Sequence, residues 1–147
     1  MNKESLGKYI SAIYRNSQSI INKKLEGYDI GSGQYDFLYV ISTNEGISQK
    51  ELSNILKIGK ATTAKAVKSL MKSGYVKRER DEKDKRFYKL YLTEKGKEIV
   101  PKIESSFKFM IGVFSEGFSD EEYENILQSL KEILDTVHRV NNELHNE

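Results

Sequence analysis

The segment from residue 60 to residue 73 carries basic side chains spaced among small ones. If it is a helix, its buried face consists of Thr63, Ala66, Val67, Leu70 and Met71. Its outward face then carries Lys60, Ala61, Thr62, Ala64, Lys65, Lys68, Ser69 and Lys72. Ammonium groups anchor phosphates, and short side chains let a helix approach the floor of a groove. The chemistry predicted for this face is therefore binding to a nucleic acid.

A second group of cations follows the basic helix. The segments Tyr75–Arg80 and Arg86–Leu92 alternate apolar with charged residues, which predicts two strands. The Asp81–Lys85 segment between them is too polar to pack in a core, so it predicts a projecting hairpin tip. Arginine at such a tip suits the negative potential of a narrow minor groove. The candidate DNA-binding residues of this hairpin are Arg78, Lys83, Lys85 and Arg86.

A preceding helix is needed to hold the basic helix in place. The Ser48–Glu51 segment has the S-x-x-E spacing of a capping box, in which Ser48 accepts from the Glu51 backbone and Glu51 reaches back to Ser48. Gly59 predicts a short turn between the two helices. This helix-turn-helix arrangement places the second helix in a major groove. Ser48 and Gln49, at the amino end of the first helix, can donate to a phosphate.

Two motifs complete the central segment, Asp81-x-x-Asp84-x-Arg86 and Leu92-Thr93-x-x-Gly96. With the helices before them, they resemble the MarR family of bacterial transcription regulators, and the resemblance extends over nearly the whole chain. It implies a winged helix-turn-helix and a homodimer on a pseudo-palindromic double-stranded operator. We expect the outcome to be repression, and the alternative of activation stays open. Asp84 is expected to orient Arg78 or Arg86, because a carboxylate near phosphates is repelled.

The resemblance also implies an effector. Many members of the family bind small aromatic or phenolic acids in a cleft between the pairing helices and the DNA-binding lobe, and then release DNA. The aromatic residues that are candidates for lining such a cleft are Tyr9, Tyr14, Tyr35, Phe37, Tyr39 and Phe107. Aromatic residues at helical spacing are more often part of a core, so that alternative stays open for each of them.

The charge of the chain is strongly segregated. The net charge of the 147 residues is only +2. Residues 57–97 hold 14 lysines and arginines against 5 acidic residues, while the remainder holds 10 against 17. Most basic runs are merely solvated faces, but here the charge falls on the segment that has the DNA-binding pattern. The middle of the chain is therefore predicted to be a phosphate-binding surface.

Composition excludes several classes of function. There is no cysteine, which removes disulfides, thiol chemistry and the commonest zinc sites. His138 and His145 stand seven residues apart without clustered carboxylates, and no catalytic motif is present. We therefore expect no metal, no cofactor and no enzyme activity. No apolar run approaches about 20 residues and the start lacks an apolar signal core, so we expect a cytoplasmic protein without a membrane partner.

The predicted fold class is mainly α with a small β hairpin (α+β). Residues 31–93 are predicted to form the winged helix-turn-helix lobe, and residues 1–30 and 94–147 a helical dimerisation region. The terminal helices, from about residue 4 to 25 and from residue 94 onward, carry apolar stripes, and Pro101 predicts a bend. The alternatives are an intrachain bundle of these helices, and a winged-helix protein used for sequence-independent DNA binding or for protein pairing.

Overall fold

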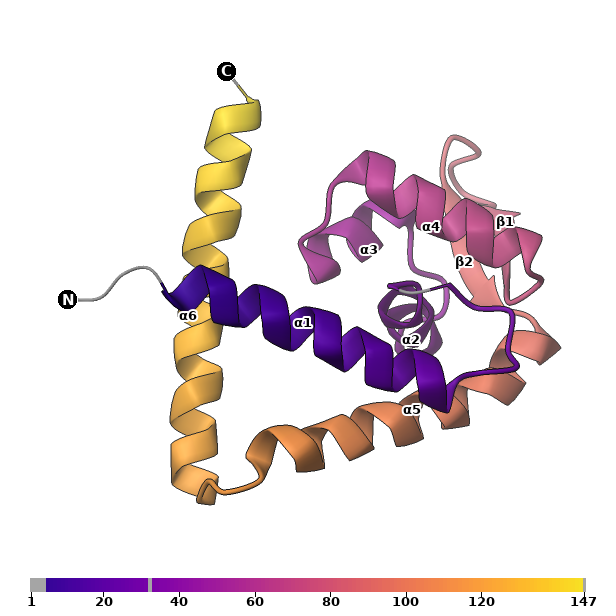
Figure 1. Ribbon diagram of the computed structural model, residues 1–147. Helices are drawn as coiled ribbons and strands as arrows, with labels where there is room; N and C mark the ends of the chain where they lie inside the picture. The colour runs from indigo at the N-terminus through magenta and orange to yellow at the C-terminus, as the bar shows by residue number, and fades with distance from the viewer. Residues whose placement is uncertain (1–4, 32, 147) are drawn as a thin grey trace. The chain divides into compact units, whose positions relative to one another are not determined.

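The computed structural model of the chain describes residues 5–31 and 33–146 (Figure 1). It confirms a mainly helical fold with one antiparallel hairpin. The predicted first helix begins at Ser5, and residue 4 lies outside the described residues. The elements are α1 (Ser5–Lys24), α2 (Tyr35–Thr43), α3 (Gln49–Leu56), α4 (Lys60–Lys72), β1 (Val76–Arg80), β2 (Tyr88–Leu92), α5 (Glu94–Ser115) and α6 (Asp120–His145).

The chain divides into two compact units, Met1–Lys108 and Phe109–Glu147. Helix α5 begins in the first unit and ends in the second. The predicted functional division, with a DNA-binding lobe over residues 31–93, stays a prediction. Among the described residues, no helix is long and apolar enough to cross a membrane.

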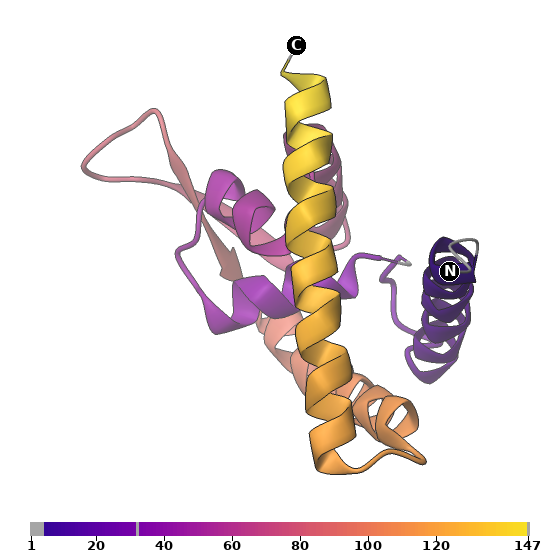
Figure 2. The ribbon, with the colours of Figure 1, turned by 90° about the vertical axis from the view of Figure 1, so that its left-hand side faces the viewer.

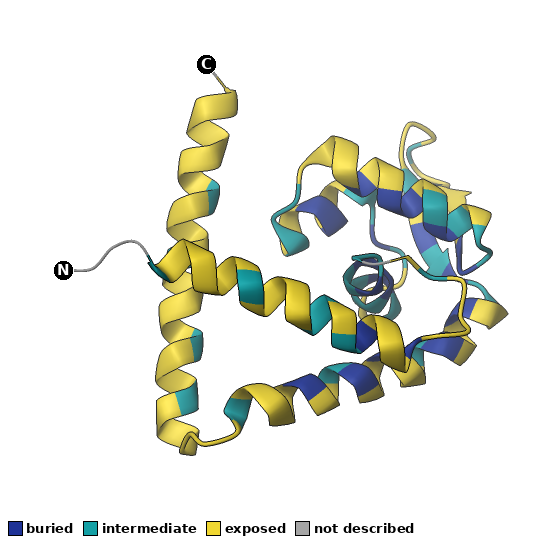
Figure 3. Cartoon of the chain, in the orientation of Figure 1, coloured by how far each residue is buried: buried dark blue, intermediate teal, exposed yellow. Residues whose placement is uncertain are grey.

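The core of the first unit is built from five consecutive elements and the start of α5. Helix α2 contributes Leu38 and Ile41, which have no exposed surface. Figure 3 shows buried positions on α2, α3, α4, the strands and the first half of α5. Burying one such side chain stabilises the fold by roughly 1.5–3 kcal/mol. The other fully buried large side chains are Tyr35, Leu52, Thr63, Val67, Leu70, Tyr75, Leu90, Ile99 and Ile103.

A buried polar contact joins α3 to α4. The Ser53 hydroxyl donates to Thr63 Oγ1 at 2.8 Å, and the Thr63 hydroxyl donates to the Gly59 carbonyl at 3.0 Å. Ser48 caps α3 by accepting from Glu51 N at 3.2 Å, and its hydroxyl donates to the Glu51 carboxylate at 3.1 Å. Glu51 therefore reaches back to Ser48 as predicted, and it does so through the Ser48 hydroxyl.

The hairpin pairs β1 with β2 from Val76↔Leu92 to Arg80↔Tyr88. Its strands are shorter than predicted, because Tyr75 and residues 86–87 lie outside the regular ladder. Ile47 adds a bridge on the other side of β2 through Leu90, which the sequence did not predict. Figure 2 shows the closed end of the hairpin projecting away from α3 and α4.

The start of α5 is fastened to the start of β1. Thr93 Oγ1 accepts from Gly96 N at 3.0 Å, and Thr93 N donates to the Tyr75 carbonyl at 3.1 Å. Gly96 lies so close to the Tyr75 carbonyl oxygen that an added Cβ would overlap it. The Lys95 ammonium donates to the Ser73 carbonyl at 2.6 Å. This explains why the chain has threonine and glycine at these places.

The two later helices differ in burial, because α5 contributes Ile99 and Ile103 to the core and α6 contributes no buried residue among those described. Helix α5 includes Pro101 within its span, and the predicted bend there stays a prediction. Helix α6 begins with the complete capping box of Ser119 and Glu122.

The Gly96→Ala substitution should destabilise the protein by about 1–3 kcal/mol, because the new methyl group cannot fit beside the Tyr75 carbonyl without moving α5 away from β1. Thermal or urea unfolding followed by circular dichroism measures the loss. Gly7→Ala is the control, since open space surrounds Gly7 inside α1, and there alanine should be neutral or stabilising by up to about 1 kcal/mol. Equal effects of the two substitutions would contradict the packing argument.

Candidate nucleic-acid interface

Helix α4 presents the face that the sequence predicts. Thr63, Ala66, Val67 and Leu70 are buried as predicted, whereas Met71, expected on the same face, is only half-buried. The outward residues that are exposed are Lys60, Ala61, Thr62, Ala64, Lys65, Lys68 and Lys72. Ser69 was expected on that face and is instead half-buried, where its hydroxyl accepts from Gln34 Nε2 at 2.8 Å. This bond ties α4 to the start of α2.

The structure brings residues from α3, α4 and the hairpin around two neighbouring clefts. The first cleft is about 230 Å³ and is lined by Ser48, Gln49, Lys50, Arg78, Arg86, Phe87 and Tyr88. The second is about 350 Å³ and is lined by Gln49, Ala64, Val67, Lys68, Met71 and Arg78. Gln49 and Arg78 belong to both clefts, so they connect the amino end of α3 with the outward face of α4 and with the hairpin.

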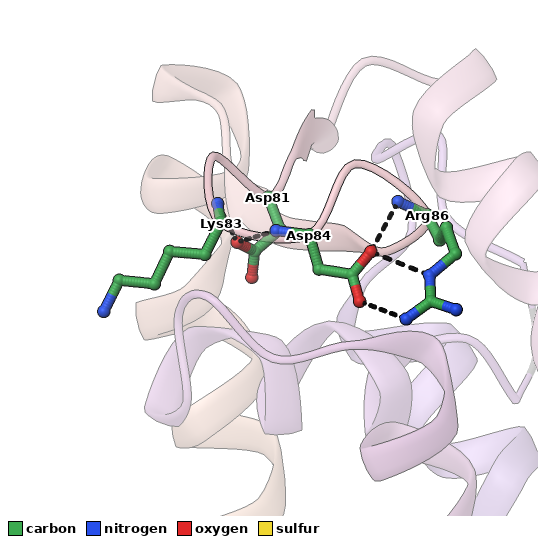
Figure 4. A network of polar contacts seen from close by, with 4 residues as sticks. All are labelled: Asp81, Lys83, Asp84 and Arg86. Carbon is green, nitrogen blue, oxygen red and sulfur yellow. Dashed lines mark hydrogen bonds and ion pairs between the residues drawn. The ribbon is translucent and has the colours of Figure 1, made fainter.

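The hairpin tip is held by a carboxylate that caps backbone amides. Asp81 Oδ1 accepts from Lys83 N at 2.8 Å and from Asp84 N at 3.2 Å (Figure 4). Lys89 Nζ lies 3.7 Å from the other oxygen of Asp81. Lys83 and Lys85 are exposed at this tip and line neither of the two clefts. Asp81 therefore shapes the loop that presents them.

Arg86 is oriented by Asp84 through a forked pair of hydrogen bonds. Arg86 Nε donates to Asp84 Oδ1 at 2.9 Å, and Nη2 donates to Oδ2 at 2.7 Å. The Arg86 backbone amide adds a third bond to Oδ1 at 3.1 Å (Figure 4). The Arg86 side chain nevertheless remains 83% exposed. Of the two arginines that Asp84 was expected to orient, the structure therefore selects Arg86.

The same contacts lower the pKa values of both tip carboxyls. The Lys83 and Asp84 amides stabilise the charged form of Asp81 and lower its pKa below the ordinary 3.8. The Arg86 side chain, followed by its backbone amide, lowers the pKa of Asp84. Both aspartates are therefore ionised over the physiological pH range. Hydrogen bonds to these two ionised carboxylates therefore hold the conformation of the tip.

Sequence reasoning missed three residues that line the first cleft, Lys50, Phe87 and Tyr88. Tyr88 was treated only as a strand residue, but it lines the first cleft beside Arg78 and Arg86. Arg80 lies opposite Tyr88 in the ladder and donates to its hydroxyl at 2.7 Å. No signal in the sequence indicates this cross-strand pair, because the pairing depends on the register of the hairpin.

The six aromatic candidates for an effector cleft differ in their surroundings. Tyr35 and Phe37 are buried in the core, whereas Tyr9 and Tyr14 are more than half exposed on α1. The rings of Tyr39 and Phe107 meet edge to face, with centroids 5.4 Å apart. Their role toward a ligand stays a prediction. Within the described residues, no group of three or more histidine and acidic side chains is placed to hold a metal ion.

Comparisons with known proteins converge on one family. The family model described as "MarR family" matches residues 28–86. The HTH-type transcriptional regulator YybA of Bacillus subtilis is 34% identical over 130 residues, covering 88% of this chain and 87% of that protein.

Two solved structures extend this similarity to the fold. A MarR transcriptional regulator from Methanosarcina mazei is 42% identical, with a TM-score of 0.80 over 94% of this chain and 99% of that one. A putative MarR family regulator from Listeria monocytogenes, solved in complex with a 26mer DNA, is 29% identical with a TM-score of 0.85, covering 95% and 91% of the two chains.

Lowering the pH should loosen the hairpin tip only below the ordinary aspartate pKa. Because the folded pKa values of Asp81 and Asp84 are depressed, the bonds to these carboxylates are complete above pH 3.8 and are lost as the pH falls through the depressed values. An NMR titration should place both carboxyls below 3.8, and Asp36 above it because burial raises its pKa. The Lys83 amide shift should follow Asp81.

The control for this titration is Asp81→Asn. The asparagine side-chain oxygen can still accept from the Lys83 amide, but it does not ionise in this range. The Lys83 amide shift should then lose its dependence on the protonation of residue 81. An Asp81 carboxyl that titrates at or above 3.8 in the unmodified protein would contradict the bonding described for the tip.

Proposed function

Because the chain belongs to the MarR family of transcriptional regulators, we propose that it binds a pseudo-palindromic DNA operator as a homodimer. It is a transcriptional regulator and not an enzyme. The observation that carries the proposal is the convergence of six predicted DNA-binding residues on the two clefts, from α3, α4 and the hairpin: Ser48, Gln49, Ala64, Lys68, Arg78 and Arg86.

In this proposal α4 is the recognition helix. Lys60, Lys65 and Lys68 are exposed along it and anchor phosphates on both sides of a major groove. Ala61, Thr62 and Ala64 are short enough to touch base edges or thymine methyl groups. The exposure of these side chains on the outward face of α4 supports this assignment.

The hairpin is the wing in this proposal. Arg86 is exposed and already oriented by Asp84, so it can enter a minor groove without first being ordered. Lys83 and Lys85 project from the same tip toward the DNA backbone. The Listeria relative bound to a 26mer DNA supports a DNA partner for this chain as well. Such a protein acts in the cytoplasm, where bacterial DNA lies.

Exposed apolar side chains support the homodimer. On α6, Ile126, Leu130, Leu134 and Val137 are all at least 40% exposed and follow helical spacing along one stripe. On α1, Leu6 is likewise more than half exposed. Exposure of such apolar stripes to water is unfavourable. The same stripes on a second copy would cover them in a two-fold interface. Two recognition helices would then lie roughly 34 Å apart on successive grooves.

We propose repression as the outcome, because a dimer that spans two grooves of a promoter excludes other proteins from it. Release by a small aromatic or phenolic ligand stays part of the proposal. The Tyr39 and Phe107 pair, half-buried in the first unit, is the place where such a ligand has aromatic surface to contact. Thermal stabilisation by a panel of aromatic acids tests it.

The protein should bind a defined DNA sequence at least about 1,000-fold more tightly than random DNA at physiological salt. Selection from a random DNA library, together with footprinting of the DNA upstream of its own gene, finds the site. Arg86→Ala should then raise the dissociation constant roughly 5- to 100-fold without unfolding the protein. The control is Arg139→Ala, which removes an arginine that also forms an exposed ion pair, with Glu143 on α6.

Three results would change this picture. An affinity that Arg86→Ala leaves unchanged removes the wing from the contact. Steep weakening by salt without preference for any sequence favours sequence-independent DNA binding. The absence of DNA binding at any sequence favours a protein-pairing module.

Analytical ultracentrifugation should give a mass twice that of one chain, which is 16.9 kDa. The double substitution Leu130→Glu and Leu134→Glu should shift it to the monomer, because two charges on each copy would be buried against apolar neighbours. Lys131→Glu is the control on the same helix, since Lys131 is exposed beside the stripe. A monomeric native protein at micromolar concentration, or a control that dissociates equally, would contradict the assigned interface.

A further inference from the structure

One aromatic ring in the hairpin contacts two arginines. Tyr88 on β2 lies directly opposite Arg80 on β1, and Arg78 opposes Leu90, the next residue on the same face. The guanidinium carbon of Arg78 is 4.4 Å from the centre of the Tyr88 ring, and that of Arg80 is 5.3 Å from it. Arg80 Nη2 also donates to the Tyr88 hydroxyl at 2.7 Å. The ring therefore organises both side chains.

These arginines differ from Arg86 in how they are held. Arg86 is paired with the Asp84 carboxylate, which neutralises part of its charge. Within residues 5–31 and 33–146, no carboxylate lies within ion-pairing distance of Arg78 or Arg80. A cation over an aromatic face is attracted by the ring quadrupole and keeps its full charge. Both arginines are thus ordered by a neutral partner and remain available to an anion.

Arg78 lies at a place where the order of its side chain affects binding of a phosphate. Arg78 lines both clefts, between the amino end of α3 and the outward face of α4. An arginine that is free to rotate loses conformational freedom when it binds a phosphate, and a side chain that is already ordered loses less. The Tyr88 ring therefore determines how well the Arg78 guanidinium is ordered before a phosphate binds at the junction of α3, α4 and the hairpin.

We propose that Tyr88 is a positioning residue that holds Arg78 ready for a DNA phosphate at this junction and keeps Arg80 ordered beside it. The inference rests on the proposed function and names a residue that acts through other side chains. Tyr88 has two separable parts: its ring faces both guanidinium groups, and its hydroxyl accepts from Arg80 alone. The hydroxyl bond and the nearby positive charges also lower the pKa of Tyr88.

The test compares Tyr88→Phe with Tyr88→Leu in the full-length protein, on the operator obtained by selection. Phenylalanine keeps the ring and loses only the hydroxyl bond, so the dissociation constant should rise by no more than about threefold. Leucine removes the ring, and the dissociation constant should rise roughly tenfold or more. The slope of log affinity against log salt should become shallower by about 0.9 for each phosphate that an arginine no longer neutralises.

The salt slope separates positioning from a merely structural role. A variant that only destabilises the fold lowers the melting temperature and the active fraction, but the remaining folded protein still binds the same phosphates. Tyr91→Leu is the matched control, because Tyr91 is also half-buried on β2 but lies on the opposite face, across from Lys77. It should leave the slope unchanged.

A double-mutant cycle shows whether Tyr88 acts through Arg78. If it does, adding Tyr88→Leu to Arg78→Ala should weaken binding much less than Tyr88→Leu weakens the unmodified protein. Full additivity, or a Tyr88→Leu variant with native affinity and slope, overturns the inference and leaves the proposed function standing. An unmodified protein that binds no DNA overturns both.

Discussion

The rotation of α4 about its own axis is the constraint on which the rest of this surface depends. Its buried face is fixed by apolar packing, and Thr63 adds a polar restraint through Ser53 on α3. The burial of several apolar side chains fixes this rotation, because lysine side chains are well solvated in many orientations and do not favour one of them. Lys65 and Lys68 therefore point outward because the opposite side of the same helix must be inside.

Cations on this surface are held by two different kinds of partner. Asp84 orients Arg86 strongly and at the expense of some positive charge, while Tyr88 orients Arg78 without cancelling any. The forked carboxylate fixes direction, which suits the proposed entry of Arg86 into a narrow groove. The aromatic face fixes position more loosely, which suits the proposed contact of Arg78 with a phosphate. The carboxylate thus fixes the direction of an arginine at the hairpin tip, and the ring preserves the charge of an arginine on β1.

Sequence alone predicted the parts of this molecule that local patterns determine. The buried and outward faces of α4 follow from helical periodicity, and the Asp84–Arg86 pair lies within three residues of chain. The Ile47–Leu90 bridge, the Gln34–Ser69 bond and the Arg80–Tyr88 pair join residues that only the folded core brings together. Periodicity carries no register, so these contacts could not be read before the fold was known.

The uneven distribution of charge has its own consequence for how such a protein meets DNA. Residues 57–97 are strongly basic, whereas the rest of the chain has 17 acidic residues against 10 basic ones. A polyanion attracts the first segment and repels the remainder over distances up to the screening length, about 8 Å at physiological salt. Attraction of the basic segment and repulsion of the acidic ones favour encounters in which the basic segment meets the duplex. A net charge of only +2 is therefore compatible with fast, oriented association, because the arrangement of charges, more than their sum, decides how the protein approaches.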